Sequence, residues 1–193
     1  MPLTPQPTES GPAPRDRRLA PYVAAVFLFW ASMYLYVPTL PIYAESKVAS
    51  LTGVGVVLSM YGLWQGLVRF PLGLISDRLG RRKPFILAGF LLSGLGACLM
   101  AAADGPILLG LGRAITGLAA GTWVPLVVSF VSLFPTGQSQ RAATLVNLVN
   151  SAGMLVAALA TGWLNRLGGY ALAFYLAAGL ALLAFGILMP VGE

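Results

Sequence analysis

Long apolar stretches alternate with short polar ones along nearly the whole chain. Six stretches reach about 20 residues, the length that a helix needs to cross the hydrocarbon core of a bilayer. The pattern therefore predicts an all-α integral membrane protein with six transmembrane helices in one membrane domain, residues 19–190. The predicted spans are residues 19–43, 51–76, 84–103, 106–134, 141–164 and 170–190. Residues 1–18 are Pro-rich and polar, and we expect them to form a disordered tail.

The composition agrees with a membrane location. Hydrophobic residues make up 58% of the chain and charged residues 9%, against roughly 25% charged residues in soluble domains. The net charge of +6 does not indicate nucleic-acid binding, because the basic residues cluster at the ends of the spans. The chain has no histidine and no catalytic motif, so we expect no enzymatic activity, metal or cofactor. The single cysteine, Cys98, is expected to be buried.

The basic residues divide unequally between the two sides of the predicted membrane domain. Two of them, Lys47 and Arg166, fall on one side. The other side receives eight: Arg15, Arg17, Arg18, Arg78, Arg81, Arg82, Lys83 and Arg141. Lysine and arginine concentrate on the cytoplasmic side of membrane proteins. We therefore expect a multi-pass protein of the cell membrane with both termini in the cytoplasm.

The most highly charged segment lies between the second and third predicted spans. It reads Gly73-Leu-Ile-Ser-Asp-Arg-Leu-Gly-Arg-Arg-Lys. Asp77 falls at the C-terminal end of a predicted helix, where the helix dipole disfavours a carboxylate. The carboxylate therefore needs a compensating partner, which is either Arg81 at position i+4 or the N-terminus of another helix.

This segment resembles the loop between helices two and three of the major facilitator superfamily, whose pattern is G-x-x-x-D-R-x-G-R-R. Six positions match in register: Gly73, Asp77, Arg78, Gly80, Arg81 and Arg82. In that family the loop closes the cytoplasmic side of the outward-open state, so the resemblance implies a conformational latch. A loop that only fixed topology would need neither Gly73 nor Asp77.

The chain also resembles itself. Residues 73–82 are similar to Gly162-Trp-Leu-Asn-Arg-Leu-Gly-Gly with one residue deleted, and Tyr36-Val-Pro is similar to Trp123-Val-Pro. Both pairs are offset by 87 or 88 residues. Because each repeat would contain three spans, the two copies would have opposite topology, as in the inverted repeats of many transporters. Chance similarity between Gly- and Leu-rich segments is the alternative.

Arg113 lies inside the fourth predicted span and begins the pattern Arg113-Ala-Ile-Thr-Gly117-Leu-Ala-Ala-Gly121. An ionisable residue within a span faces protein or water and is a functional candidate. Gly117 and Gly121 form a small-residue stripe against which another helix can pack closely. The pattern resembles the fourth-helix motif of the superfamily, R-x-x-x-G-x-x-x-G, whose arginine is linked to proton handling or substrate charge. The alternative is a packing stripe with an arginine that extends to the surface.

Polar and aromatic side chains in other spans are further candidates for lining a substrate cavity. They are Trp30, Tyr34, Gln65, Arg69, Asn147 and Asn150. Helix packing is the alternative for the aromatic pair and the asparagines, and contact with lipid headgroups is the alternative for Arg69. Gly153 matches a packing glycine in the fifth-helix motif of antiporters. Met154 and the alanines at 157 and 158 depart from that motif, which weakens an antiport assignment.

The resemblance covers about residues 17–190 and implies one half of a twelve-helix fold. It implies a secondary transporter that exports small organic molecules by alternating access. The expected partners are a small-molecule substrate, membrane lipid, and a second six-helix half or another copy of the chain. The chain would then be either a truncated product or a half-transporter. The alternatives are a non-transporting partner of another membrane protein and a facilitator or uptake permease of the same superfamily.

Overall fold

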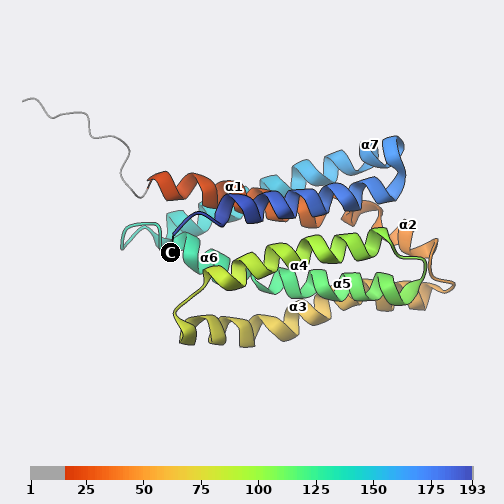
Figure 1. Ribbon diagram of the computed structural model, residues 1–193, viewed down its shortest axis with the longest axis horizontal. Helices are drawn as coiled ribbons and strands as arrows, with labels where there is room; N and C mark the ends of the chain where they lie inside the picture. Colours follow the sequence, from red (N-terminus) through yellow and green to blue (C-terminus); the bar gives the residue numbers. More distant parts are fainter. Residues whose placement is uncertain (1–15, 193) are drawn as a thin grey trace, which may run out of the picture.

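The computed structural model describes residues 16–192, and all the regular structure in that range is helical (Figure 1). The elements are α1 Asp16–Tyr34, the 3-10 helix η1 Val37–Thr39, α2 Leu40–Glu45, α3 Leu51–Leu79, α4 Lys83–Ala101, α5 Pro106–Gly121, α6 Trp123–Val131 and α7 Ser139–Leu188. The predicted all-α architecture is therefore confirmed. Most of the expected tail lies outside the described residues, but α1 begins at Asp16, so the last three residues assigned to the tail are helical.

Five helical segments of the described chain are long and apolar enough to cross a membrane. They are Arg18–Glu45, Leu51–Leu79, Lys83–Ala101, Pro106–Val131 and Ser139–Leu188. The fifth and sixth predicted spans both lie within α7, which has 50 residues. Gly168 and Gly169 interrupt α7 with non-helical backbone angles, and Gly169 has a φ of 66°, a region that favours glycine. Past this interruption the ribbon turns back along the bundle toward the C-terminal end (Figure 1).

Two of the membrane segments are broken next to the two similar sequences, Tyr36-Val-Pro and Trp123-Val-Pro. The first breaks between Tyr34 and Val37, where the sequence predicts a kinked end. The second breaks at Thr122, between α5 and α6, whereas the sequence predicted one continuous span over residues 106–134. Pro38 and Pro125 follow the two breaks. Proline has no N–H to donate to the preceding turn, which favours an interruption just before it.

Each break lies beside a helix from the other half of the chain. Near the α5–α6 break, a Cβ added to Gly73 of α3 would lie 3.5 Å from a methyl carbon of Val124. Near the α1–η1 break, the Thr161 hydroxyl of α7 donates to the Leu35 carbonyl at 2.8 Å. Asn165 Nδ2 then donates to Thr39 Oγ1 at 2.7 Å. The two breaks therefore have similar packing environments.

The helices differ greatly in how much of their surface the chain itself covers. Phe29, Phe90 and Phe130 are fully buried where α1, α4 and α6 meet. In contrast, only 11% of the most apolar window of α3 is buried, against 61% for Pro106–Val131. α3 therefore presents most of its surface to lipid or to another polypeptide. Cys98 is exposed on α4, so the prediction that it is buried is wrong.

Candidate functional site

The most unusual side chain in the bundle is Arg113 of α5, which is only 7% exposed. Its guanidinium lies over the ring of Tyr61 of α3, 4.5 Å from the ring centroid. Its Nε is buried without a hydrogen-bond partner, and no carboxylate pairs with it among residues 16–192. The ring contact stabilises the cation. It offsets only part of the cost of an arginine within a membrane span, which destabilises insertion by about 2.5–3.5 kcal/mol.

Two tyrosines from different parts of the chain, Tyr36 and Tyr61, interact with this cation, and a third, Tyr34, lies next to Tyr61. Tyr36, in the break after α1, places its hydroxyl where it interacts with Arg113 and Thr116. Tyr34 and Arg69 are electrostatic neighbours of Tyr61. We call Tyr34, Tyr36, Tyr61 and Arg113 the tyrosine–arginine cluster. It combines one unpaired positive charge with aromatic faces and hydroxyl groups, which suits an aromatic or anionic ligand.

Sequence reasoning identified Arg113 and Tyr34 but missed the other two members of the cluster. Tyr61 lies one helical turn before Gln65, so extending the polar seam of α3 by one turn would have found it. Tyr36 was noted only as part of the repeat. Its position beside Arg113 depends on the interruption of the first span, which brings the chain across the end of α1.

Trp30 lies in an aromatic cluster next to these residues. Its side chain is 6% exposed and packs edge-on against Trp123 of α6, with ring centroids 5.3 Å apart. Tyr34 lies 6.1 Å from Trp30, as the i, i+4 spacing implies. The indole N–H of Trp30 is buried without a hydrogen-bond acceptor among the described residues. A ligand that carries an acceptor can satisfy this donor.

The other predicted cavity residues are not members of the cluster, although Arg69 is an electrostatic neighbour of Tyr61. Gln65 is half-buried, and Arg69 is exposed on α3. Asn147 is exposed and donates to the Ala143 carbonyl of its own helix at 2.9 Å. Asn150 is half-buried, and its Oδ1 has no hydrogen-bond partner in the described chain. Of these four, the structure therefore leaves Asn150 as the one with an unsatisfied buried polar atom.

The three predicted packing glycines all lie where helices approach closely. A Cβ added at Gly117 would overlap the backbone carbonyl of Tyr61, and one at Gly121 would overlap a methyl group of Val68. Both contacts bring α5 against α3. A Cβ at Gly153 of α7 would lie 2.6 Å from the Phe27 carbonyl oxygen of α1. Such distances are too short for any side chain, so these helix pairs depend on glycine.

The predicted latch segment forms an ion pair, but not with Arg81, which was one of the two partners that the sequence left open. Arg82 Nη2 donates to Asp77 Oδ1 at 2.9 Å, whereas Arg81 is exposed. The physical reason is Gly80, which ends α3 with a φ of 62°. The helix stops before Arg81, so the i+4 relation between positions 77 and 81 no longer applies. Gly73 and Arg78 lie on α3 itself, and Arg78 is exposed.

Lys83, the last residue of the segment, connects it to the end of the chain. Its ammonium group donates to the carbonyl oxygens of Met189 (2.7 Å) and Val191. These carbonyls follow the last turn of α7, where a cation interacts favourably with the helix dipole. The segment is therefore attached to the C-terminal end of the bundle as well as to α3.

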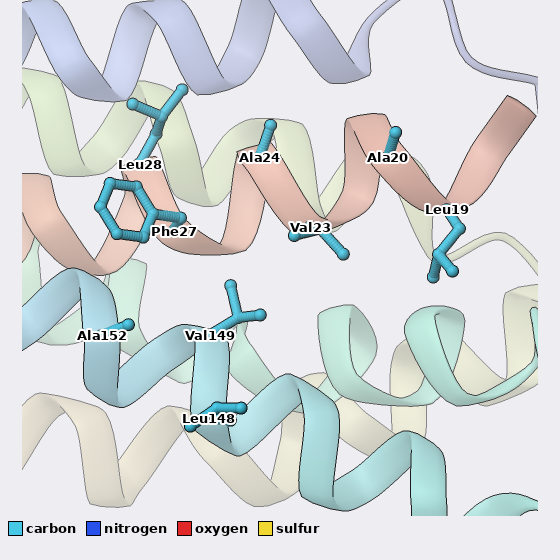
Figure 2. A pocket seen from close by; sticks show the side chains of 9 residues that line it. All are labelled: Leu19, Ala20, Val23, Ala24, Phe27, Leu28, Leu148, Val149 and Ala152. Carbon is cyan, nitrogen blue, oxygen red and sulfur yellow. The ribbon is translucent and has the colours of Figure 1, made fainter.

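An apolar groove runs between α1 and the first part of α7 (Figure 2). It has a volume of about 870 Å³ and is lined by Leu19, Ala20, Val23, Ala24, Phe27, Leu28, Leu148, Val149 and Ala152. None of these side chains carries a polar group. The groove can therefore accommodate a hydrocarbon chain, but it cannot fix the orientation of a polar ligand.

The family assignment rests on a match along most of the sequence. The family model described as Major Facilitator Superfamily matches residues 22–192. The chain belongs to this superfamily. The charged segment after α3 and the Arg113 pattern on α5, described above, lie within the matched residues.

Two curated relatives show how the chain compares with longer members of the superfamily. It is 27% identical over 179 residues to the quinolone resistance protein NorB of Staphylococcus aureus, a match that covers 92% of this chain and 38% of NorB. It is 35% identical over 109 residues to the inner membrane transport protein YajR of Escherichia coli, which covers 55% of this chain and 24% of YajR. The chain thus spans well under half the length of either relative.

Solved structures support the same fold. The POT family transporter PepTSo superposes with a TM-score of 0.78 at 20% identity, covering 90% of this chain and 37% of PepTSo. A bacterial homolog of the human lysosomal transporter Spinster, in an inward-facing and unoccupied conformation, gives a TM-score of 0.75 at 17% identity. That match covers 95% of this chain and 44% of the homolog. At these identities the likeness establishes the fold alone.

Proposed function

We propose that this protein is a secondary transporter that exports small organic molecules across the cell membrane by alternating access. The observation that carries the proposal is the tyrosine–arginine cluster, where Arg113 is buried without a carboxylate partner among residues 16–192. A buried charge that weakens insertion persists where it has a function. The curated relative NorB is named for quinolone resistance, so an aromatic drug with a carboxylate is the substrate class we propose.

The bundle would be one half of a twelve-helix transporter, with six spans arranged as an inverted three-plus-three repeat. Support comes from the repeat-related breaks after α1 and α5, from the interruption of α7 at Gly168 and Gly169, and from the exposure of α3. The exposed α3 would pack against a second six-helix half or another copy of this chain. Both termini would lie in the cytoplasm, since the basic residues concentrate on that side.

The residues would then have distinct roles. Arg113 would bind the substrate anion or respond to the coupling ion, with Tyr36 and Tyr61 providing hydroxyl and ring contacts. Trp30, next to the tyrosine–arginine cluster, would contribute its unsatisfied indole N–H. The Asp77–Arg82 pair would act as the latch that holds the cytoplasmic side closed.

The proposal is tested by reconstituting the chain into liposomes and following a fluorescent quinolone under an imposed proton or sodium gradient. Wild-type protein should move the quinolone, and Arg113→Gln should reduce the rate at least tenfold. Arg113→Gln should not lower stability, because it removes a buried charge that has no carboxylate partner. A loss of transport by a protein that is as stable as wild type therefore separates function from folding.

The matched control is Arg141→Gln, which removes an exposed arginine at the start of α7. It should transport like wild type. Failure of wild-type protein to move the quinolone under either gradient would contradict transport by this chain alone or by two copies of it. Equal losses in Arg113→Gln and Arg141→Gln would mean that Arg113 has no special role.

A further inference from the structure

A second, polar pocket is lined by residues from the charged segment, the start of α1, the end of α6 and the C-terminal end. These segments lie at the same end of the bundle (Figure 1). The pocket has a volume of about 260 Å³, below the range of about 300–1,000 Å³ typical of drug-sized ligands. It is lined by Arg18, Tyr22, Gly80, Arg82, Ser129, Ser132, Leu133 and Gly192. The proposed substrate site around Arg113 shares none of these residues.

Two guanidinium groups from distant parts of the sequence contribute to this pocket. Arg18 comes from the first turns of α1, and its Nη2 lies 3.7 Å from where a Cβ at Gly192 would be. Arg82 comes from the turn before α4 and uses one nitrogen, Nη2, for Asp77. Its Nε is buried and has no hydrogen-bond partner in the described chain. The pocket therefore contains an unsatisfied donor next to a second cation.

The remaining polar groups of the pocket are also donors or small hydroxyls. The Ser132 hydroxyl donates to the Ser129 carbonyl at 2.8 Å. The Ser129 side chain has no hydrogen bond to the described residues, so its hydroxyl is available to donate. Among the described residues that line the pocket, none carries a carboxylate. Guanidinium groups with hydroxyl and N–H donors are the usual protein partners of phosphate oxygens.

We propose that this pocket binds a phosphate-type anion, which is either the phosphate headgroup of a membrane lipid or free phosphate. Its oxygens accept from the Arg82 guanidinium, from the Arg18 guanidinium and from the Ser129 hydroxyl. Because these three residues belong to the turn after α3, to α1 and to α6, the anion joins elements from both halves of the chain. It also holds Arg82 beside Asp77, so binding stabilises the closed form of the latch segment.

The test uses the purified 193-residue chain in detergent, with thermal unfolding followed by tryptophan fluorescence. Inorganic phosphate is titrated against sodium chloride at matched ionic strength. In a second arm, mixed micelles containing phosphatidic acid are compared with micelles containing phosphatidylcholine. We expect a saturable rise in the unfolding temperature of wild-type protein with phosphate, with phosphatidic acid, or with both. Phosphate alone identifies a free anion, and phosphatidic acid alone identifies a lipid headgroup.

Variants distinguish the pocket from general charge effects. Arg18→Gln should weaken binding about tenfold or more, since a hydrogen bond to a charged group is lost. Ser129→Leu, which fills the pocket and keeps both arginines, should abolish binding as well. Arg141→Gln, which removes a cation outside the pocket, should bind like wild type. The proposal is overturned if neither ligand stabilises wild-type protein, or if the stabilisation persists in both pocket variants, or if Arg141→Gln weakens it equally.

Discussion

Replacing Asp77 by asparagine tests the latch segment with almost no change of shape. A well-formed hydrogen bond between charged groups contributes about 1.5–3 kcal/mol. The side chains of Arg82 and Asp77 are 36% and 61% exposed, however, so solvent screens the pair. Pairs of this kind contribute about 0.2–1 kcal/mol. Removing the charge also removes its unfavourable interaction with the dipole of α3, which is worth about 0.3–1 kcal/mol.

These two effects nearly cancel in the folded chain. We therefore expect Asp77→Asn to change the free energy of unfolding by less than about 1 kcal/mol. Because a factor of ten corresponds to about 1.4 kcal/mol, the pair can shift a conformational equilibrium by at most about fivefold. Transport of a quinolone into proteoliposomes should fall by no more than that factor. Stability is measured by unfolding in detergent mixtures, followed by tryptophan fluorescence.

Arg82→Gln provides the matched variant, since it removes the same pair from the other side. In a double-mutant cycle, the coupling free energy between positions 77 and 82 should be about 0.2–1 kcal/mol. A tenfold or larger loss of transport in Asp77→Asn, with folding intact, would refute this reasoning. It would mean that the carboxylate binds a more buried partner during the transport cycle than Arg82.

Three other predictions follow from contacts within the bundle. Gly117→Ala should lower the free energy of unfolding by about 1–3 kcal/mol through overpacking. The control Gly186→Ala, where a Cβ meets nothing within 4 Å, should be neutral or slightly stabilising. Equal effects of the two variants on unfolding would exclude the close α3–α5 approach as the cause of the destabilisation. Asn165→Ala should lower the free energy of unfolding by about 0.5–1.5 kcal/mol, because the hydrogen bond from Asn165 to Thr39 of η1 is lost. An unchanged free energy of unfolding would mean that this bond is not formed. In a variant without Cys98, single cysteines replace Lys47 or Arg81, and an impermeant maleimide is applied to intact cells. The cysteine at position 47 should be labelled and the one at position 81 should not. The reverse pattern would show that the topology is opposite to the predicted one.

Features that depend on local sequence could be predicted, and those that depend on tertiary contacts could not. The apolar runs indicated the membrane helices because bilayer thickness sets their length. The break at Thr122 was missed, although the likeness of Trp123-Val-Pro to Tyr36-Val-Pro was the available signal. The pairing of Asp77 with Arg82 was missed because the i+4 rule assumes a continuous helix, and Gly80 ends it.

The composition of the buried site was also only partly predictable. Arg113 could be identified because a cation inside an apolar run is unusual. Its neighbours Tyr36 and Tyr61 come from segments more than fifty residues away in sequence. The packing of α5 against α3 brings Tyr61 to it, and the break after α1 brings Tyr36. The glycines of α5 permit that packing, since any side chain at Gly117 would separate the two helices.

The interruptions after α1 and α5 divide two membrane crossings into a long and a short piece. η1 and α2 together are nine residues, and α6 is also nine, beside the 19 residues of α1 and the 16 of α5. Rotation about a few backbone torsions at Tyr36 or Thr122 would swing a short piece while its long neighbour stays packed. One end of the bundle would then narrow while the opposite end stays unchanged. Under the transport function proposed above, movements at the two breaks would close the substrate path at one place or at both.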